Sequence, residues 1–165
     1  MKTRQSLSGG GVTAALTQYS FDDAGHIQCA AVRMNSGAYG NLPSSACTLG
    51  SISAAGTDRI VRIAYDAGGQ PTSTTSAYGT AEASVDAKSY TPNGQEASVV
   101  DASGNRTRYG YDRFDRLTHT VYPVYTPGQN ASNGGDYEQL GYDANGEVTS
   151  AVCAMARPSP TAMTR

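Results

Sequence analysis

The stretch Asp101-Ala102-Ser103-Gly104-Asn105-Arg106-Thr107-Arg108-Tyr109-Gly110-Tyr111-Asp112 decides the fold of this chain. It opens with a tetrad in which Asp is followed by two variable residues and Gly. The Asp side chain can accept a hydrogen bond from the backbone N–H two residues on, and Gly can take the left-handed conformation that ends such a turn. The residues that follow alternate, which puts Thr107, Tyr109 and Tyr111 on one face of a strand. The stretch therefore predicts a tight turn that leads into a β-strand.

The same tetrad, usually preceded by an aromatic residue, recurs along the chain. The copy at 91–94 has Thr in place of Asp, and the copy at 112–115 ends in Asp, which tolerates the left-handed conformation better than most residues. Tetrads that start at 91, 101 and 112 are spaced as successive hairpins are. The residues that we expect to build the turns are Asp22, Gly25, Asp66, Gly69, Gly94, Asp101, Gly104, Asp112, Asp143 and Gly146.

Between the turns the sequence reads as strands, and helix signals are nearly absent. We therefore predict an all-β fold of antiparallel β-hairpin repeats, forming a curved, unclosed sheet with little or no helix. The repeat region is expected over 12–150, after a flexible N-terminus at 1–11 and before a disordered tail at 151–165. Stretches rich in Gly, Ser, Asn and Pro near 35–57 and 123–136 are predicted to be loop insertions.

Composition narrows the function. The chain has 11 Tyr, 2 Phe and no Trp, and its mean hydropathy of -0.43 indicates a shallow core. Its net charge is -2 without any run of Lys or Arg, so we expect no nucleic-acid partner. No apolar stretch is long enough to span a bilayer, and residues 1–11 lack the apolar core of a signal peptide. If the protein is exported, we expect its signal to be missing here or to lie in a larger parent.

Candidate chemistry is sparse. Cys29, Cys47 and Cys153 form no CxxC motif, so no metal site is expected. Cys29 and Cys47 could pair as a disulfide, but small buried thiols are the favoured interpretation. His26 and His119 are the only imidazole bases, and both are expected to be strand residues. We predict no catalytic residues, no cofactor and no enzyme activity.

The turn-and-strand pattern resembles the RHS or YD repeat. The resemblance is carried by residues 93–112 and by the turns that start at Tyr65-Asp66 and Tyr142-Asp143. It extends over roughly Val12 to Ser150 and is most specific from 90 to 118. The resemblance implies an origin in a large secreted or surface-exposed bacterial protein, in whose family the repeats wind as a β-ribbon into a hollow shell. Such a shell can enclose a toxic C-terminal domain, as in polymorphic toxins.

The resemblance also implies partners, namely other RHS repeats of a larger parent and an enclosed toxin domain. This chain departs from the family pattern in three ways. It holds too few repeats for a complete shell, it shows no match to the self-cleaving segment that ends such shells, and no toxin domain follows. The leading expectation is therefore a non-catalytic wall segment. It would be secreted or at the cell surface, or cytoplasmic as an orphan fragment.

A second class of function remains open, since tyrosines can stack on sugars or contact a protein surface. Such a carbohydrate- or protein-binding module would use a face made of Tyr109, Tyr111, Tyr122 and Tyr142, with a glycan or cell-surface partner. A non-functional truncated remnant is a further alternative.

The repeat pattern is absent from the tail at 151–165, and the codons that could encode the tail suggest a reason. If the codons of residues 156–165 are read one base earlier, they permit Gly-Ser-Ala-Ile-Thr-Tyr-Ser-Tyr-Asp-Ala, in which the codons of Met163-Thr164 force the Asp. That peptide reads as the next Tyr-Asp repeat. A frameshift is therefore one hypothesis for the tail, and an ordinary disordered terminus is the other.

Overall fold

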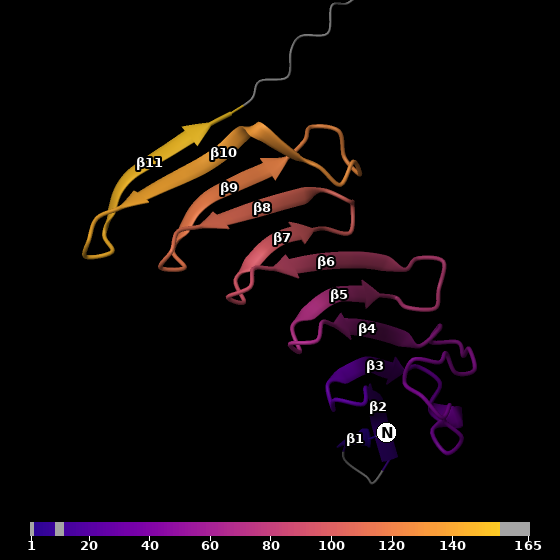
Figure 1. Ribbon diagram of the computed structural model, residues 1–165. Helices are drawn as coiled ribbons and strands as arrows, with labels where there is room; N and C mark the ends of the chain where they lie inside the picture. The colour runs from indigo at the N-terminus through magenta and orange to yellow at the C-terminus, as the bar shows by residue number, and fades with distance from the viewer. Residues whose placement is uncertain (1, 9–11, 156–165) are drawn as a thin grey trace, which may run out of the picture. The chain divides into compact units, whose positions relative to one another are not determined.

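The computed structural model describes residues 2–8 and 12–155, and it is all-β (Figure 1). For residues 2–8 and 12–15 only the backbone is described. One 3₁₀ turn, η1 (Ser36–Ala38), is the only helical segment in the described part. The strands are β1 (Lys2–Ser8), β2 (Val12–Phe21), β3 (Ile27–Arg33), β4 (Arg59–Tyr65), β5 (Pro71–Ser76), β6 (Ser84–Tyr90), β7 (Glu96–Val100), β8 (Arg106–Tyr111), β9 (Leu117–Pro123), β10 (Ser132–Tyr142) and β11 (Val148–Ala154).

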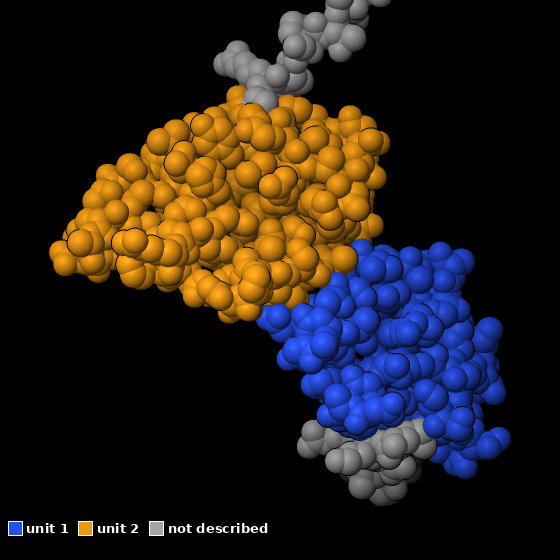
Figure 2. Space-filling view, in the orientation of Figure 1, with its two compact units in different colours: residues 1–86 blue, residues 87–165 orange. Residues whose placement is uncertain are grey.

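The chain divides into two compact units, residues 1–86 and 87–165 (Figure 2). Within each unit the strands are neighbours in chain order, and the registered pairs are antiparallel, as in β2 with β3 and β8 with β9. The strand order begins at β1 and ends at β11 without closing. The predicted fold class, an unclosed antiparallel all-β structure with almost no helix, is confirmed.

Each hairpin whose turn directly follows an aromatic residue has the same irregularity. The register shifts directly before the aromatic residue, at Phe21, Tyr65, Tyr90, Tyr111 and Tyr142. Such a bulge follows from the turn, whose fourth residue has a positive φ, for example 60° at Asp115. The motif therefore fixes both where the chain reverses and how the aromatic side chain leaves the strand.

Gly104 needs to be glycine for two reasons. Its φ is 78°, and a Cβ there would lie 2.9 Å from the Cα of Gly128. The loop between β9 and β10 lies against this turn, and the amide of Asn130 donates a hydrogen bond of 2.9 Å to the carbonyl of Gly104. A larger residue would push this loop away from the turn.

Buried side chains are concentrated in the first unit. Its core consists of Cys29, Ala31, Ala46 and Ile60, which lie between strands β3 and β4 and the segment that joins them. In the described part of the second unit, Ser98 alone is buried. The shallow core that the composition indicated is thus confined to the part of the chain with the long insertion.

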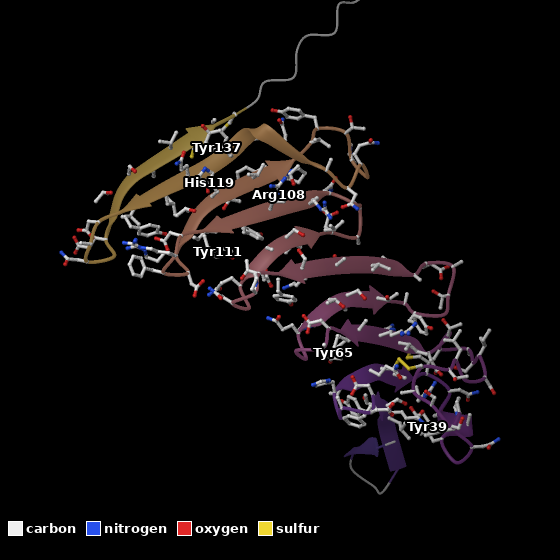
Figure 3. The ribbon with its side chains drawn as sticks, in the orientation of Figure 1. Tyr39, Tyr65, Arg108, Tyr111, His119 and Tyr137 are labelled. Carbon is white, nitrogen blue, oxygen red and sulfur yellow. A yellow bond between two sulfur atoms is a disulfide. The ribbon has the colours of Figure 1, made fainter. Side chains whose placement is uncertain are left out.

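The interpretation of Cys29 and Cys47 as free thiols is wrong, because they form a disulfide with a Cα–Cα distance of 5.3 Å (Figure 3). The insertion after β3 folds back over that strand and brings Cys47 beside Cys29. Sequence spacing alone does not report that return. Cys153 is free and exposed.

Several boundaries differ from the expected ones. Strand β1 occupies Lys2–Ser8 inside the segment expected to be a flexible N-terminus, because those residues pair with β2. Strand β11 runs to Ala154, past the expected end of the repeats at 150, and residues 156–165 lie outside the described part. The 35–57 insertion contains no named strand, whereas β10 begins inside the expected 123–136 loop. No helix in the described part is long and apolar enough to cross a membrane.

Candidate functional site

The repeated turns gather at one edge of the sheet within each unit (Figure 1). In the first unit they are residues 22–25 and 66–69, and in the second 91–94, 112–115 and 143–146. In each, the amide of the fourth residue donates to the carbonyl of the first, over 2.9–3.2 Å. The tetrad at 101–104 has the same geometry but joins β7 and β8 at the other edge. Within each unit, we call the edge that carries the turns at 22–25, 66–69, 91–94, 112–115 and 143–146 the turn edge.

In the turns that begin with Asp, the Asp side chain accepts hydrogen bonds from backbone amides inside the turn. Asp143 Oδ1 accepts hydrogen bonds from the amides of Asn145 at 2.9 Å and Glu147 at 2.8 Å. The same pair of bonds, to the second and fourth following amides, occurs at Asp66 and Asp101. At Asp101 the bond from the Asn105 amide is the main cause of a pKa below the usual value. The ionised carboxylate is therefore part of the turn.

The tyrosines that directly precede Asp66, Asp112 and Asp143 each reach the neighbouring turn of the same edge. The hydroxyl of Tyr65 donates to the carbonyl of Ile27 over 2.9 Å. Tyr111 donates to Glu96 over 2.8 Å, and Tyr142 to Leu117 over 2.7 Å. In every case the acceptor is the fifth residue after the first residue of the preceding turn. We call this contact the tyrosine clamp.

A second contact accompanies the clamp where the fourth residue after the Asp carries a ring or a guanidinium. Arg116 Nε donates to Asp112 Oδ2 over 2.7 Å, and its guanidinium lies 4.5 Å from the ring centre of Tyr142. In the first unit, His26 Nδ1 lies 3.1 Å from Asp22 Oδ2, and its ring is 4.7 Å from that of Tyr65. In both cases the Asp of one turn contacts the Arg or His, and this side chain contacts the tyrosine of the next turn. We call this chain of contacts the ladder, because it links one turn to the next.

We compared the chain with protein-family models, with curated proteins and with solved structures. The family model described as RHS Repeat matches residues 90–126, which include three turns and the Tyr111 clamp. Residues 90–126 thus match an RHS repeat. No curated protein matches the sequence. Among solved structures, the chain is similar to TcdB2-TccC3-Cdc42, with 19% identity, a TM-score of 0.49, and coverage of 87% of this chain and 8% of that chain. It is also similar to TcdB2-TccC3 without its hypervariable C-terminal region, with 19% identity, a TM-score of 0.47, and coverage of 88% and 8%. The chain spans about 8% of the length of those chains.

The four tyrosines considered for a binding face do not act alike around the RHS repeat. Tyr111 and Tyr142 give their hydroxyls to backbone carbonyls as clamps. Burial, with Glu96 and Tyr109 nearby, raises the pKa of Tyr111. Tyr109 pairs in register with Thr120. Partial burial and a hydrogen bond with Glu138 raise the pKa of Tyr122. Two of the four are therefore structural parts of the repeat.

The spaces between successive turns are open recesses. One of about 490 Å³ lies between the turns at 112–115 and 143–146, lined by Phe114, Tyr142 and the arginines at 113 and 116. Phe114 is 63% exposed there, with the guanidinium of Arg113 4.8 Å from its ring centre. Another recess, of about 310 Å³, lies between the turns at 91–94 and 112–115. Neither is lined by Ser, Cys or His, the usual nucleophiles and bases of hydrolases.

The first unit holds a buried polar network that the sequence analysis missed. Arg33 and Asp58, 3% and 5% exposed, form an ion pair of 2.6 Å between Nη1 and Oδ2. Arg33 also donates to Gln18 Oε1 and to the carbonyls of Ser45 and Thr48. Although burial acts to raise the pKa of Asp58, its bonds with the Met34 amide, Arg33 and the Gly50 amide hold it below the usual value.

This network ties down the insertion between β3 and β4. Arg33 and Asp58 stand at the two ends of the insertion, directly before Met34 and directly after Thr57. A single basic and a single acidic residue that bracket a long loop were the signal available in the sequence. Together with the Cys29–Cys47 disulfide, they fix the insertion on the sheet.

The two histidines occupy different environments. His26 belongs to the ladder and directly precedes β3, rather than lying within a strand. His119 lies in β9 opposite Gly110, with its ring centre 6.2 Å from that of Tyr137 (Figure 3). In the described residues, no group of three or more His, Cys, Asp or Glu could hold a metal ion.

Proposed function

We propose that this chain is a non-catalytic structural segment of an RHS-type protein, whose hairpins supply wall to a β-shell. The observation that carries the proposal is the tyrosine clamp. Three of the aromatic residues that precede a turn Asp use their hydroxyls to join one repeat to its neighbour. Side chains that could do chemistry are thereby committed to holding repeats together. In repeat proteins, stability comes largely from such nearest-neighbour contacts.

The wall would enclose or present a toxin or effector domain of a larger parent, in the manner of a polymorphic toxin. Other RHS repeats of that parent would be its direct partners. Export to the cell surface or the medium is part of the proposal, and the Cys29–Cys47 bond supports it. Structural disulfides form and persist in oxidising compartments and are rare in a reducing cytosol.

A binding module is the second candidate, and the recess around Phe114 is the observation that favours it. An exposed aromatic ring beside two guanidinium groups offers stacking and hydrogen-bond donors to a glycan or to a partner protein. It ranks second because Arg116 is already bound to Asp112 and to the carbonyl of Asp143. The hydroxyl of Tyr142 is likewise engaged with a carbonyl.

Sedimentation of the full chain over a wide concentration range tests the wall proposal. A wall segment presents unpaired strand edges, so it should associate as concentration rises. A sharp monomer that is independent of concentration would contradict the proposal. Calorimetric titration with a glycan panel forms the second arm. Glycan binding by the wild type that is lost in Phe114→Ala, but kept in Tyr125→Ala at another exposed aromatic position, would establish the binding module instead.

A further inference from the structure

The turn edge ends with an acceptor of the same kind as those used in the clamps. Val148 is the fifth residue after Asp143, as Glu96 is after Thr91 and Leu117 is after Asp112. All three face the aromatic residue of their own turn across the same register shift. Among the described residues, no tyrosine hydroxyl reaches the carbonyl of Val148, and no strand pairs with the outer edge of β11.

The complete clamp in the RHS repeat shows what sequence should follow such an acceptor. Tyr111, which donates to the Glu96 carbonyl, lies fifteen positions after Glu96, and the turn glycine Gly104 lies eight positions after Glu96. The turn Asp directly follows the donor. Counted in the same way from Val148, the next repeat needs Gly at position 156, Tyr at 163 and Asp at 164.

The protein's own reading frame does not supply these residues, but the frame one base earlier does. Met has the single codon ATG, and Ala codons begin with GC. The last base of the Met155 codon and the first two of the Ala156 codon therefore read GGC, which encodes Gly at position 156. By the same logic, the codons of Met163 and Thr164 give GAC, which encodes Asp at position 164. Both residues are fixed whatever synonymous codons the gene uses.

We propose that β11 is a docking edge for the next Tyr-Asp repeat, and that the gene encodes this repeat one base out of frame from position 156 onward. One base lost near the codon of Met155 accounts for the two frames. The tyrosine of the hidden repeat would donate its hydroxyl to the Val148 carbonyl. Its strand would pair with the outer edge of β11. The match departs from the complete repeat at Cys153, which stands where Asp101 opens the earlier turn.

The inference rests on the proposed function in one respect, namely that neighbouring repeats stabilise each other through tyrosine clamps. The alignment itself depends on spacing and on the genetic code. The remaining positions of the shifted frame also fit, since position 161 permits Tyr opposite Tyr109 and position 162 permits Gly or Ser opposite Gly110. Whether the shifted frame encodes the two tyrosines depends on the third base of two codons. Tyr appears at 161 only if the Pro160 codon is CCT, and at 163 only if the Ala162 codon is GCT.

The DNA sequence of the gene is the first test. We expect CCT for Pro160 and GCT for Ala162. Any other base at either place gives His, Asn or Asp in the shifted frame and overturns the inference. This outcome is independent of the wall proposal, because it does not depend on how the protein associates or on what it binds.

The docking edge is tested in the full chain by replacing residues 156–165 with Gly-Ser-Ala-Ile-Thr-Tyr-Ser-Tyr-Asp-Ala. Hydrogen exchange of the backbone amides of Val148–Ala154 is then compared with the wild type. We expect slower exchange in the replaced chain, and a partial return to the wild-type rate when the second tyrosine of the new peptide is changed to phenylalanine. Exchange equal to the wild type in the replaced chain would overturn the docking edge.

Discussion

Removing a single oxygen atom tests the tyrosine clamp most directly. In Tyr111→Phe the ring stays in place, while the 2.8 Å hydrogen bond to the Glu96 carbonyl is lost. The ring's packing and the turn at 112–115 are unchanged, so the substitution isolates the contact between two turns. Glu96 belongs to β7 and Tyr111 ends β8, so the bond joins neighbouring hairpins of the second unit.

The expected loss follows from the ordinary net value of a protein hydrogen bond. Such a bond contributes about 1 kcal/mol to the free energy of unfolding. In a unit of the size of residues 87–165, that loss lowers the melting temperature by roughly 4–8 °C. Tyr142→Phe removes the equivalent bond to Leu117. The two bonds share no partner, so the double variant should lose about twice as much.

Thermal and urea unfolding followed by far-ultraviolet circular dichroism would measure the loss. The matched control is Tyr109→Phe, the same chemical change two residues earlier on the same strand. Tyr109 is not a clamp residue, so its variant should unfold like the wild type. If Tyr111→Phe and Tyr109→Phe unfold at the same urea concentration, the clamp does not stabilise the contact between turns. The main support for the proposed wall function would then be lost.

Three further outcomes are expected. Reducing the Cys29–Cys47 bond, which closes a loop of 18 residues, should destabilise the first unit by about 3 kcal/mol in urea unfolding; an unchanged midpoint would show that the insertion is held by its other contacts alone. Arg33→Met should cost about 3–5 kcal/mol, because it leaves Asp58 buried without its cation, and a loss below 1 kcal/mol, within the range of an exposed pair, would contradict this. The third outcome concerns Asp112, whose pKa is lower in the folded protein than in the unfolded chain. Partial burial acts to raise this pKa, but hydrogen bonds with Arg116 and the Phe114 amide outweigh burial and lower it. Its contribution is therefore present above the unfolded pKa, near 3.8, and is lost as pH falls through the folded value, so Asp112→Asn should show a shallower acid-induced loss than the wild type.

The fold class was predictable because the chemistry that sets it is local. An Asp, two variable residues and a residue that accepts positive φ specify a reversal without information from the rest of the chain. The alternation after Gly104 then gives the strand. Even the exception at Asp115 was accessible, since Asp tolerates the conformation that it adopts at φ 60°.

What the sequence did not provide depends on contacts between distant residues. The Cys29–Cys47 bond and the Arg33–Asp58 pair both need the insertion to fold back on β3, and no local pattern encodes that return. The clamp was missed for a related reason. Alternation places Tyr111 on a face of its strand, but the register shift at the turn directs its hydroxyl to the neighbouring hairpin. The sequence analysis considered Tyr111 and Tyr142 only for a binding face, because the register shift is not visible in the sequence.

The near absence of buried side chains in the second unit has a thermodynamic consequence. The heat capacity change on unfolding arises mainly from apolar surface that becomes hydrated. A sheet in which Ser98 is the only buried described residue exposes little new apolar surface when it unfolds. The free energy of unfolding of residues 87–165 should therefore vary with temperature along a flatter curve than that of the first unit, and cooling should weaken it less.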